Sequence, residues 1–186
     1  MPENSARAVY AVEVAGVQRN LPLFEVAPGV RIAVLNILGD VELVQAAAEA
    51  LAPRLLERQP DTLLTAETKS IPLIHVLAAL TQRPYVVLRK AYKPYMGAAL
   101  SAETLSITTG APQTLYLDEK DIALLRGRRV ALVDDVISTG STLQALRTLA
   151  NSAGAQIVAE AAIFTEGAEA QWQDIIALGH LPIFTA

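Results

Sequence analysis

The sequence predicts an α/β protein, a single domain over residues 1–186 built on a mostly parallel, twisted sheet with helices on its faces. Short runs that are apolar on both faces, such as residues 130–133, alternate with longer runs of helical period. A chain of 186 residues is the size of one domain. Apolar residues make up 52% of the chain and charged residues 18%, which favours a buried core over disorder.

The first 40 residues predict a small hood that precedes this sheet. Residues 9–14 are apolar and β-branched apart from Glu13, the chain turns near Gly16, and residues 18–24 resume the pattern, which indicates an antiparallel hairpin. A further strand is expected over residues 31–36. From Val41 onward apolar residues recur at helical spacing, and Pro53 is expected to kink or end that helix.

Beyond residue 60, strands and helices alternate as a parallel sheet requires. Strands are expected over residues 62–65, 85–88, 129–133 and 156–164, and helices over 71–80 and 142–153. The stretch 90–119 differs, because it is rich in Tyr, Ser, Thr, Gly and Pro and contains two short candidate strands, 104–108 and 114–117. Such a segment is typical of a functional loop, and we expect a flexible lid over residues 91–118.

Composition excludes several classes of function. The chain has no cysteine, which excludes disulfide frameworks, thiolate zinc sites and cysteine nucleophiles. Its net charge of −4 creates no overall field that attracts nucleic acid. No secretory signal is visible at the start, and the uncharged stretch 70–82 is too short to span a bilayer. We expect a soluble, cytoplasmic protein that binds neither nucleic acid nor membrane.

The segment 130–143 contains the most informative pattern. A buried strand ends in two adjacent carboxylates, Asp134 and Asp135, and an amphipathic helix begins shortly afterwards. The amides at the start of that helix can form a phosphate cradle, to which the connecting loop adds Ser138, Thr139, Gly140, Ser141 and Thr142. Carboxylates repel phosphate but accept hydrogen bonds from vicinal hydroxyls of a ribose. The order therefore predicts a site for a ribose 5-phosphate.

This segment resembles the 5-phosphoribosyl-1-pyrophosphate (PRPP) motif of type I phosphoribosyltransferases, and the resemblance extends over most of the chain. Residues 66–70 are similar to the family's pyrophosphate loop, and residues 87–90 with Lys93 to the basic stretch that opens its lid. The order and spacing are closest to the adenine, or purine, branch. The resemblance implies a homodimer that transfers ribose 5-phosphate from PRPP to a purine base, with Mg²⁺ held mainly through PRPP and pyrophosphate.

The resemblance also implies a role for each residue. Asp134, Asp135, Lys69 and Lys93 are expected to be catalytic, and residues 138–142 to bind the 5-phosphate. Pyrophosphate is expected to contact seven residues: Glu67, Thr68, Lys69, Ser70, Arg89, Lys90 and Lys93. The base is expected over Val136, with Phe164 either stacking on it or packing in the core. A cis peptide is expected at Glu67–Thr68 or Thr68–Lys69, and no dedicated protein ligands for a metal are expected.

Several positions depart from the family pattern. Ser138 stands where the hypoxanthine-guanine branch has an aspartate that handles the purine N7 proton, which disfavours guanine because serine is no base near neutral pH. Thr108 stands where the adenine branch has a lid glutamate, and Lys69 and Ser70 replace an arginine and a glycine. Xanthine, another purine or no base stays open. The alternative function is a PRPP- or nucleotide-binding regulatory protein of the same fold with little or no transferase activity.

Overall fold

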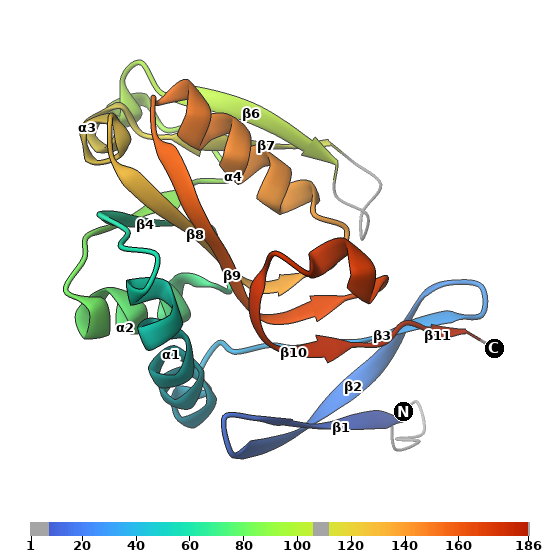
Figure 1. The fold of residues 1–186 in the computed structure, drawn as a ribbon. Helices are drawn as coiled ribbons and strands as arrows, with labels where there is room; N and C mark the ends of the chain where they lie inside the picture. The colour runs from blue at the N-terminus through green and yellow to red at the C-terminus, as the bar shows by residue number, and fades with distance from the viewer. Residues whose placement is uncertain (1–7, 106–111, 186) are drawn as a thin grey trace.

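A five-stranded parallel sheet in the order β10-β9-β8-β4-β5 forms the centre of the molecule (Figure 1). Its strands are β4 (Thr62–Ala66), β5 (Tyr85–Leu88), β8 (Arg129–Ile137), β9 (Gln156–Glu166) and β10 (Ile176–Leu181). The structure, a computed structural model, describes residues 8–105 and 112–185. The predicted α/β class with its parallel sheet is therefore confirmed.

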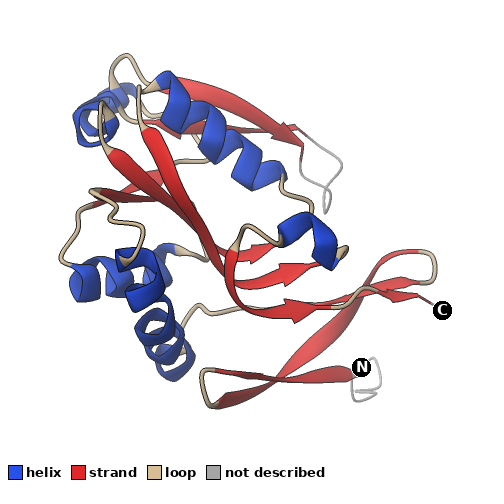
Figure 2. Ribbon diagram, in the orientation of Figure 1, coloured by secondary structure: helices blue, strands red, loops and turns tan. Residues whose placement is uncertain are grey.

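Helices cover both faces of this sheet (Figure 2). On one face lie α1 (Val41–Leu56) and α2 (Ile71–Thr81), and on the other lie α3 (Ile122–Leu125), α4 (Ser141–Ser152) and the hairpin of β6 (Leu100–Leu105) and β7 (Pro112–Leu117). Successive β8 residues alternate between two cores. Ala131 and Val133 pack with α1 and α2, whereas Val130 and Leu132 pack with α4. Burial on both sides is why residues 130–133 are uniformly apolar.

The hood is a second, antiparallel sheet in the order β1-β2-β3-β11. Strands β1 (Val9–Val14) and β2 (Val17–Ala27) form the predicted hairpin. Ala15 and Gly16 close it with φ angles of 51° and 80°, and a two-residue hairpin turn of this kind needs positive φ at both positions. Strand β3 (Val30–Ala33) follows, and β11 (Phe184–Thr185) pairs with it, so that the last described residues join the hood.

In this region the predicted strand end at residue 36 is wrong, and of the two outcomes expected at Pro53, an end of the helix is wrong. The strand expected over 31–36 pairs only as far as Ala33, but burial still alternates at Leu35 and Ile37, because both side chains enter the core. In the sequence, this alternation of apolar positions looks the same as a longer paired strand. Helix α1 continues past Pro53 to Leu56, since Pro53 is exposed and its carbonyl still accepts from the Glu57 amide at 3.2 Å.

A hairpin occupies much of the stretch in which a lid is expected. The backbones of Arg89 and Tyr116 exchange hydrogen bonds of 2.9 and 2.8 Å, which join β7 to the edge strand β5. A short 3-10 helix, η1 (Pro94–Met96), precedes β6. Residues 106–108 of the expected strand, Thr108 among them, lie outside the described residues. Mobility of the lid stays a prediction.

Several elements near the carboxyl terminus were not predicted from the sequence. Strand β10 extends the parallel sheet beside β9, and β11 belongs to the hood. Two 3-10 helices, η2 (Glu119–Asp121) and η3 (Glu169–Trp172), were also missed. Short turns of this kind have no hydrophobic period long enough to recognise.

Candidate functional site

The topology creates a crevice at the carboxyl ends of β4 and β8. Strand β4 leads through loop 67–70 and α2 to β5, whereas its neighbour β8 leads through loop 138–140 and α4 to β9 on the opposite side. Ligands of open α/β sheets bind where two adjacent strands diverge in this way. A cavity of about 590 Å³ lies here, lined by both loops, the hood and the β6–β7 hairpin.

Asp134 and Asp135 lie near the end of β8 and line this cavity. Ser70, which is buried, connects the two carboxylates, because its Oγ lies 2.7 Å from Asp134 Oδ1 and 3.0 Å from Asp135 Oδ1. The Asp135 amide donates to Ser70 Oγ at 3.0 Å and to Asp134 Oδ1 at 2.9 Å. Burial and the adjacent Asp135 carboxylate raise the pKa of Asp134 to about 8. The pair therefore holds a proton at neutral pH in the ligand-free protein.

Loop 67–70 presents cations and backbone to the same cavity. Its Glu67–Thr68 peptide bond is cis, which confirms one of the two expected positions. The Glu67 carboxylate pairs with the Arg89 guanidinium and accepts from the Lys90 amide at 2.9 Å, so it holds the ends of β4 and β5 together. Lys69 and Lys90 line the cavity, and Lys69 Nζ donates to Leu35 O at 3.3 Å. Two predicted pyrophosphate ligands thus converge with the acid pair.

Loop 138–140 turns sharply at Gly140, whose φ is 77°. A Cβ atom there would lie 2.9 Å from Trp172 Cη2, so the indole packs directly on the loop and leaves room for glycine alone. Gly140 occupies the N-cap position of α4 and supplies no side-chain acceptor to the first amides of that helix. All five residues of the predicted phosphate cradle, 138–142, line the cavity.

Glu166, at the end of β9, is a cavity residue that sequence reasoning did not predict. It is only 3% exposed, yet it lines the cavity. Ser138 Oγ donates to Glu166 Oε2 over 2.5 Å, and Trp172 Nε1 donates to the Glu166 carbonyl over 2.9 Å. The sequence signal was a single carboxylate at the end of a long apolar run. The predicted strand ends at Phe164, so Glu166 lies two residues beyond it.

Three of the predicted site residues lie outside the cavity. Phe164 is buried in the core and lies so close to Gly179 that a Cβ there would be 2.8 Å from the ring, which favours the packing alternative. Lys93 is exposed, and Arg89 pairs with Glu67. Among the described residues, none of these three lines the cavity.

The remaining walls of the cavity come from the lid hairpin and the hood. Thr104 and Gln113 face each other across β6 and β7, and both line the cavity. Thr104 Oγ1 is buried and has no hydrogen-bond partner within residues 8–105 and 112–185. The hood side is apolar, with the following lining side chains: Val26, Val30, Ile32 and Ile183. A polar region therefore adjoins a wall that suits a planar ring.

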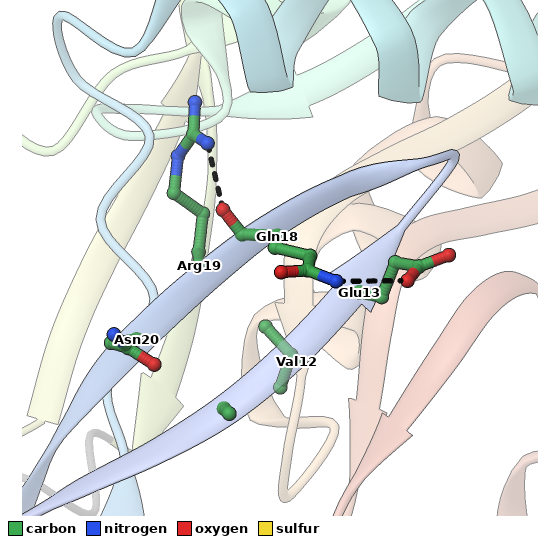
Figure 3. Close-up of a pocket in the computed structure, with 6 residues that line it drawn as sticks. Val12, Glu13, Gln18, Arg19 and Asn20 are labelled. Atoms are coloured by element: carbon green, nitrogen blue, oxygen red, sulfur yellow. Dashed lines mark hydrogen bonds between the residues drawn. The ribbon is translucent and has the colours of Figure 1, made fainter.

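A second depression, of about 640 Å³, lies on the hood hairpin (Figure 3). There Gln18 Nε2 donates to Glu13 Oε2 at 3.5 Å, and Arg19 Nη1 donates to the Gln18 carbonyl at 2.8 Å. Arg19 also pairs with Asp40, 2.7 Å away. We place the functional site in the cavity at the sheet edge, because the acid pair, the cations and both loops converge there.

The central parallel sheet, the strand that ends in two acids and the two loops define an α/β protein of the phosphoribosyltransferase type. The sequence model of the phosphoribosyl transferase domain matches residues 34–177, and the chain belongs to this family. Within the described residues no helix is both long and apolar enough to cross a membrane.

Curated relatives include both enzymes and regulators. The hypoxanthine/guanine phosphoribosyltransferase of Methanosarcina acetivorans is 35% identical over 131 residues, which are 69% of this chain and 64% of that protein. The purine biosynthesis transcriptional activator PurR of Lactococcus lactis is 27% identical over 142 residues, which are 76% of this chain and 51% of that protein. The chain thus spans about half the length of the PurR relatives from Lactococcus and Bacillus.

Solved structures share the fold over nearly the whole chain. The adenine phosphoribosyltransferase of Thermoanaerobacter pseudethanolicus superposes with a TM-score of 0.67 and 21% identity, over 93% of this chain and 95% of that one. The Giardia lamblia enzyme, solved with 9-deazaadenine, has a TM-score of 0.67 and 17% identity, over 92% and 93% of the two chains. At these identities the likeness shows a common fold.

Proposed function

We propose that the protein is a purine phosphoribosyltransferase, which transfers ribose 5-phosphate from PRPP to a purine base and releases pyrophosphate. One observation supports this most directly. The segment 134–142, which holds the acid pair and the phosphate-type loop, lies far in the sequence from the cations Lys69 and Lys90, yet all of them line one cavity. Membership of the phosphoribosyl transferase domain family supports the same reaction.

The sugar and its 5-phosphate would occupy the β8 side of the cavity. The Asp134 and Asp135 carboxylates accept hydrogen bonds from the ribose hydroxyls, and Ser70 holds the two carboxylates at a common position. The amides at the start of α4, with the hydroxyls of Thr139, Ser141 and Thr142, bind the phosphate. These contacts orient the ribose so that its C1 faces the base.

Pyrophosphate would depart toward loop 67–70. Negative charge develops on the leaving group as the C1–O bond breaks, and Lys69 and Lys90 stabilise that charge in the cavity. Among the described residues no cluster of three metal-ligating side chains exists, but two adjacent carboxylates and substrate oxygens suit Mg²⁺, which keeps several waters. Mg²⁺ bound through PRPP and pyrophosphate would neutralise part of the charge on the leaving group.

The base would lie over Val136 and against the apolar hood wall, where residues such as Ile32 and Ile183 offer a dry surface for a planar ring. The lid would close over the opposite side and exclude water, because an open site would hydrolyse PRPP. We also propose a homodimer, on the resemblance to the family, which sedimentation velocity would test.

A regulatory function is the second candidate. The match to the transcriptional activator PurR of Lactococcus lactis covers 76% of this chain, which supports a regulatory protein with the same fold as the alternative. Such a protein would bind PRPP at the same cavity and return it unchanged.

Product analysis separates the two candidates. The protein is incubated with PRPP, Mg²⁺ and, in turn, adenine, hypoxanthine, guanine, xanthine and orotate, and nucleotide is measured by chromatography. The double variant Asp134→Asn with Asp135→Asn is the control, and we expect it to fold but to lose PRPP binding and activity. Nucleotide from a purine supports the enzyme. PRPP binding without product from any base supports the regulator, and PRPP affinity unchanged in the double variant would refute both.

A further inference from the structure

The indole of Trp172 connects the end of β9 to loop 138–140. Its Nε1 donates to the Glu166 carbonyl at 2.9 Å. The opposite edge of the ring faces Gly140, because a Cβ built on Gly140 would lie 2.9 Å from Cη2 and 3.5 Å from Cζ3. Trp172 is partly buried against the core cluster that contains the inner side of α4, and its carbonyl accepts from the Ile175 amide at 3.0 Å. The ring therefore has a fixed neighbour at each end.

The hydrogen bonds between Thr139 and Ser141, on either side of Gly140, are long. Their hydroxyl oxygens lie 3.4 Å apart, and the Ser141 amide lies 3.5 Å from Thr139 Oγ1, beyond the usual length of such bonds. Gly140 itself has a φ of 77° and no side chain that could cap α4. The close contact at the turn comes from Trp172, which is held in turn by the Glu166 carbonyl. The end of β9 thus contributes to the shape of the loop.

The position of Gly140 determines where the first amides of α4 lie. Its carbonyl accepts from the Gln144 amide at 2.8 Å, the bond that opens the helix. Glycine has access to more backbone conformations than other residues, so a loop that turns at glycine loses more entropy when a ligand orders it. A ring packed on that glycine reduces this loss before the ligand arrives. Within the described ranges Trp172 is not among the residues that line the cavity, so its effect on a ligand must pass through Gly140.

We propose that Trp172 is a positioning residue, which holds Gly140 and the amides that follow it in the arrangement that binds the 5-phosphate. The inference rests on the proposed function. It assigns part of the affinity for a phosphorylated pentose to η3, a segment that lies outside the motif 130–142. Substitution of Trp172 should therefore weaken the binding of ribose 5-phosphate and of PRPP alike.

A double-variant cycle tests whether the indole acts through Gly140. Trp172→Phe removes the ring atoms that face Gly140, and Gly140→Ala adds a Cβ that meets those atoms. In calorimetry we expect Gly140→Ala to raise the Kd for ribose 5-phosphate about tenfold or more, and Trp172→Phe about threefold or more. The added Cβ has room beside the smaller ring. In the Trp172→Phe background, Gly140→Ala should therefore raise the Kd less than about threefold.

Two control variants separate this effect from backbone strain and from lost stability. Gly127→Ala places a side chain at a φ of 69°, but no described atom lies within 4 Å of the added Cβ, so it adds strain without a contact. Leu125→Ala removes a buried side chain from the core cluster on which Trp172 packs, but from α3, which precedes β8, whereas loop 138–140 follows that strand. Urea unfolding compares the stability of all the variants. Both controls should leave the Kd for ribose 5-phosphate within about twofold.

The pattern of dissociation constants decides the outcome. A smaller effect of Gly140→Ala in the Trp172→Phe background, with unchanged affinity in both controls, supports the role of Trp172. The inference is overturned if Trp172→Phe leaves the Kd unchanged, if Leu125→Ala raises it as much as Trp172→Phe does, or if Gly140→Ala raises it by the same factor in both backgrounds. Failure of the proposed function gives a different result, because the natural protein would then bind neither ribose 5-phosphate nor PRPP, and the role of Trp172 would fall with it.

Discussion

Replacement of Asp134 by asparagine should stabilise the ligand-free protein at neutral and alkaline pH. The Asp134 pKa is raised from 3.8 to about 8 by burial and by the Asp135 carboxylate. An acid whose pKa is higher in the folded state binds more protons folded than unfolded, so the free energy of unfolding falls as pH rises between these two values. Asparagine resembles the protonated acid and can still accept from Ser70 and the Asp135 amide.

The size of the effect follows from linkage. A shift of this size lowers the free energy of unfolding by roughly 4 kcal/mol between pH 4.5 and pH 7.5, at about 1.4 kcal/mol per pKa unit over the range in which the unfolded acid is ionised. Asp134→Asn should remove this decline. The variant should therefore be more stable than the natural protein by up to about 5 kcal/mol at pH 7.5, and by about 1 kcal/mol at pH 4.5.

Urea unfolding at four pH values between 4.5 and 8.5 measures the effect, with phosphate-free buffers to keep the cavity empty. Asp174→Asn serves as the control, because Asp174 is exposed and lies outside the cavity. The reasoning is refuted if Asp134→Asn and Asp174→Asn give parallel pH profiles, or if the Asp134→Asn profile declines as steeply as that of the natural protein.

Three further predictions concern the two loops. Gly140→Ala should lower the free energy of unfolding by about 1–3 kcal/mol, because φ is 77° at this position and the added Cβ would lie 2.9 Å from Trp172 Cη2. The variant should also bind ribose 5-phosphate more weakly. The fluorescence of Trp172, the single tryptophan, measures both effects. Lys69→Ala should raise the Kd for PRPP at least tenfold and Lys93→Ala less than about threefold, because Lys69 lines the cavity and Lys93 does not. Equal effects of the two variants in calorimetry would contradict the assignment. Ser70→Ala should lower the free energy of unfolding by about 1–3 kcal/mol at pH 7, because the buried carboxylates of Asp134 and Asp135 lose the hydroxyl that donates to them. Thermal unfolding measures this loss, and an unchanged Tm would argue against the role of Ser70.

Much of the α/β core follows from local sequence pattern. The runs at 85–88 and 130–133 are apolar on both faces because helices cover both sides of these strands, and the period of residues 142–153 matches the buried side of α4. The acid pair and its loop were also predictable, because the strand end, the carboxylates, the glycine and the helix start are contiguous in the chain. Where all the parts of a site are adjacent in sequence, their order already constrains their geometry.

The boundaries that failed did so where packing overrides local preference. Residues 34–37 alternate like a strand because Leu35 and Ile37 enter the core, although the paired strand ends at Ala33. Pro53 does not end α1, because its ring is exposed and Leu55 anchors the last turn in the core. The sequence pattern left two alternatives for Phe164, packing in the core or stacking on the base. In the structure Phe164 packs in the core beside Gly179.

The order of residues in 130–142 and in loop 66–70 was enough to predict that both segments belong to a ligand-binding site. The loops that follow parallel strands lie at the same edge of the sheet, so the two segments were expected to lie close together. The hydrogen bonds of Ser138 with Glu166 and of Ser70 with both aspartates, and the ion pair of Arg89 with Glu67, join segments that are separate in the chain. Strand order and register set those contacts, and they arise from the packing of the whole domain rather than from any one segment.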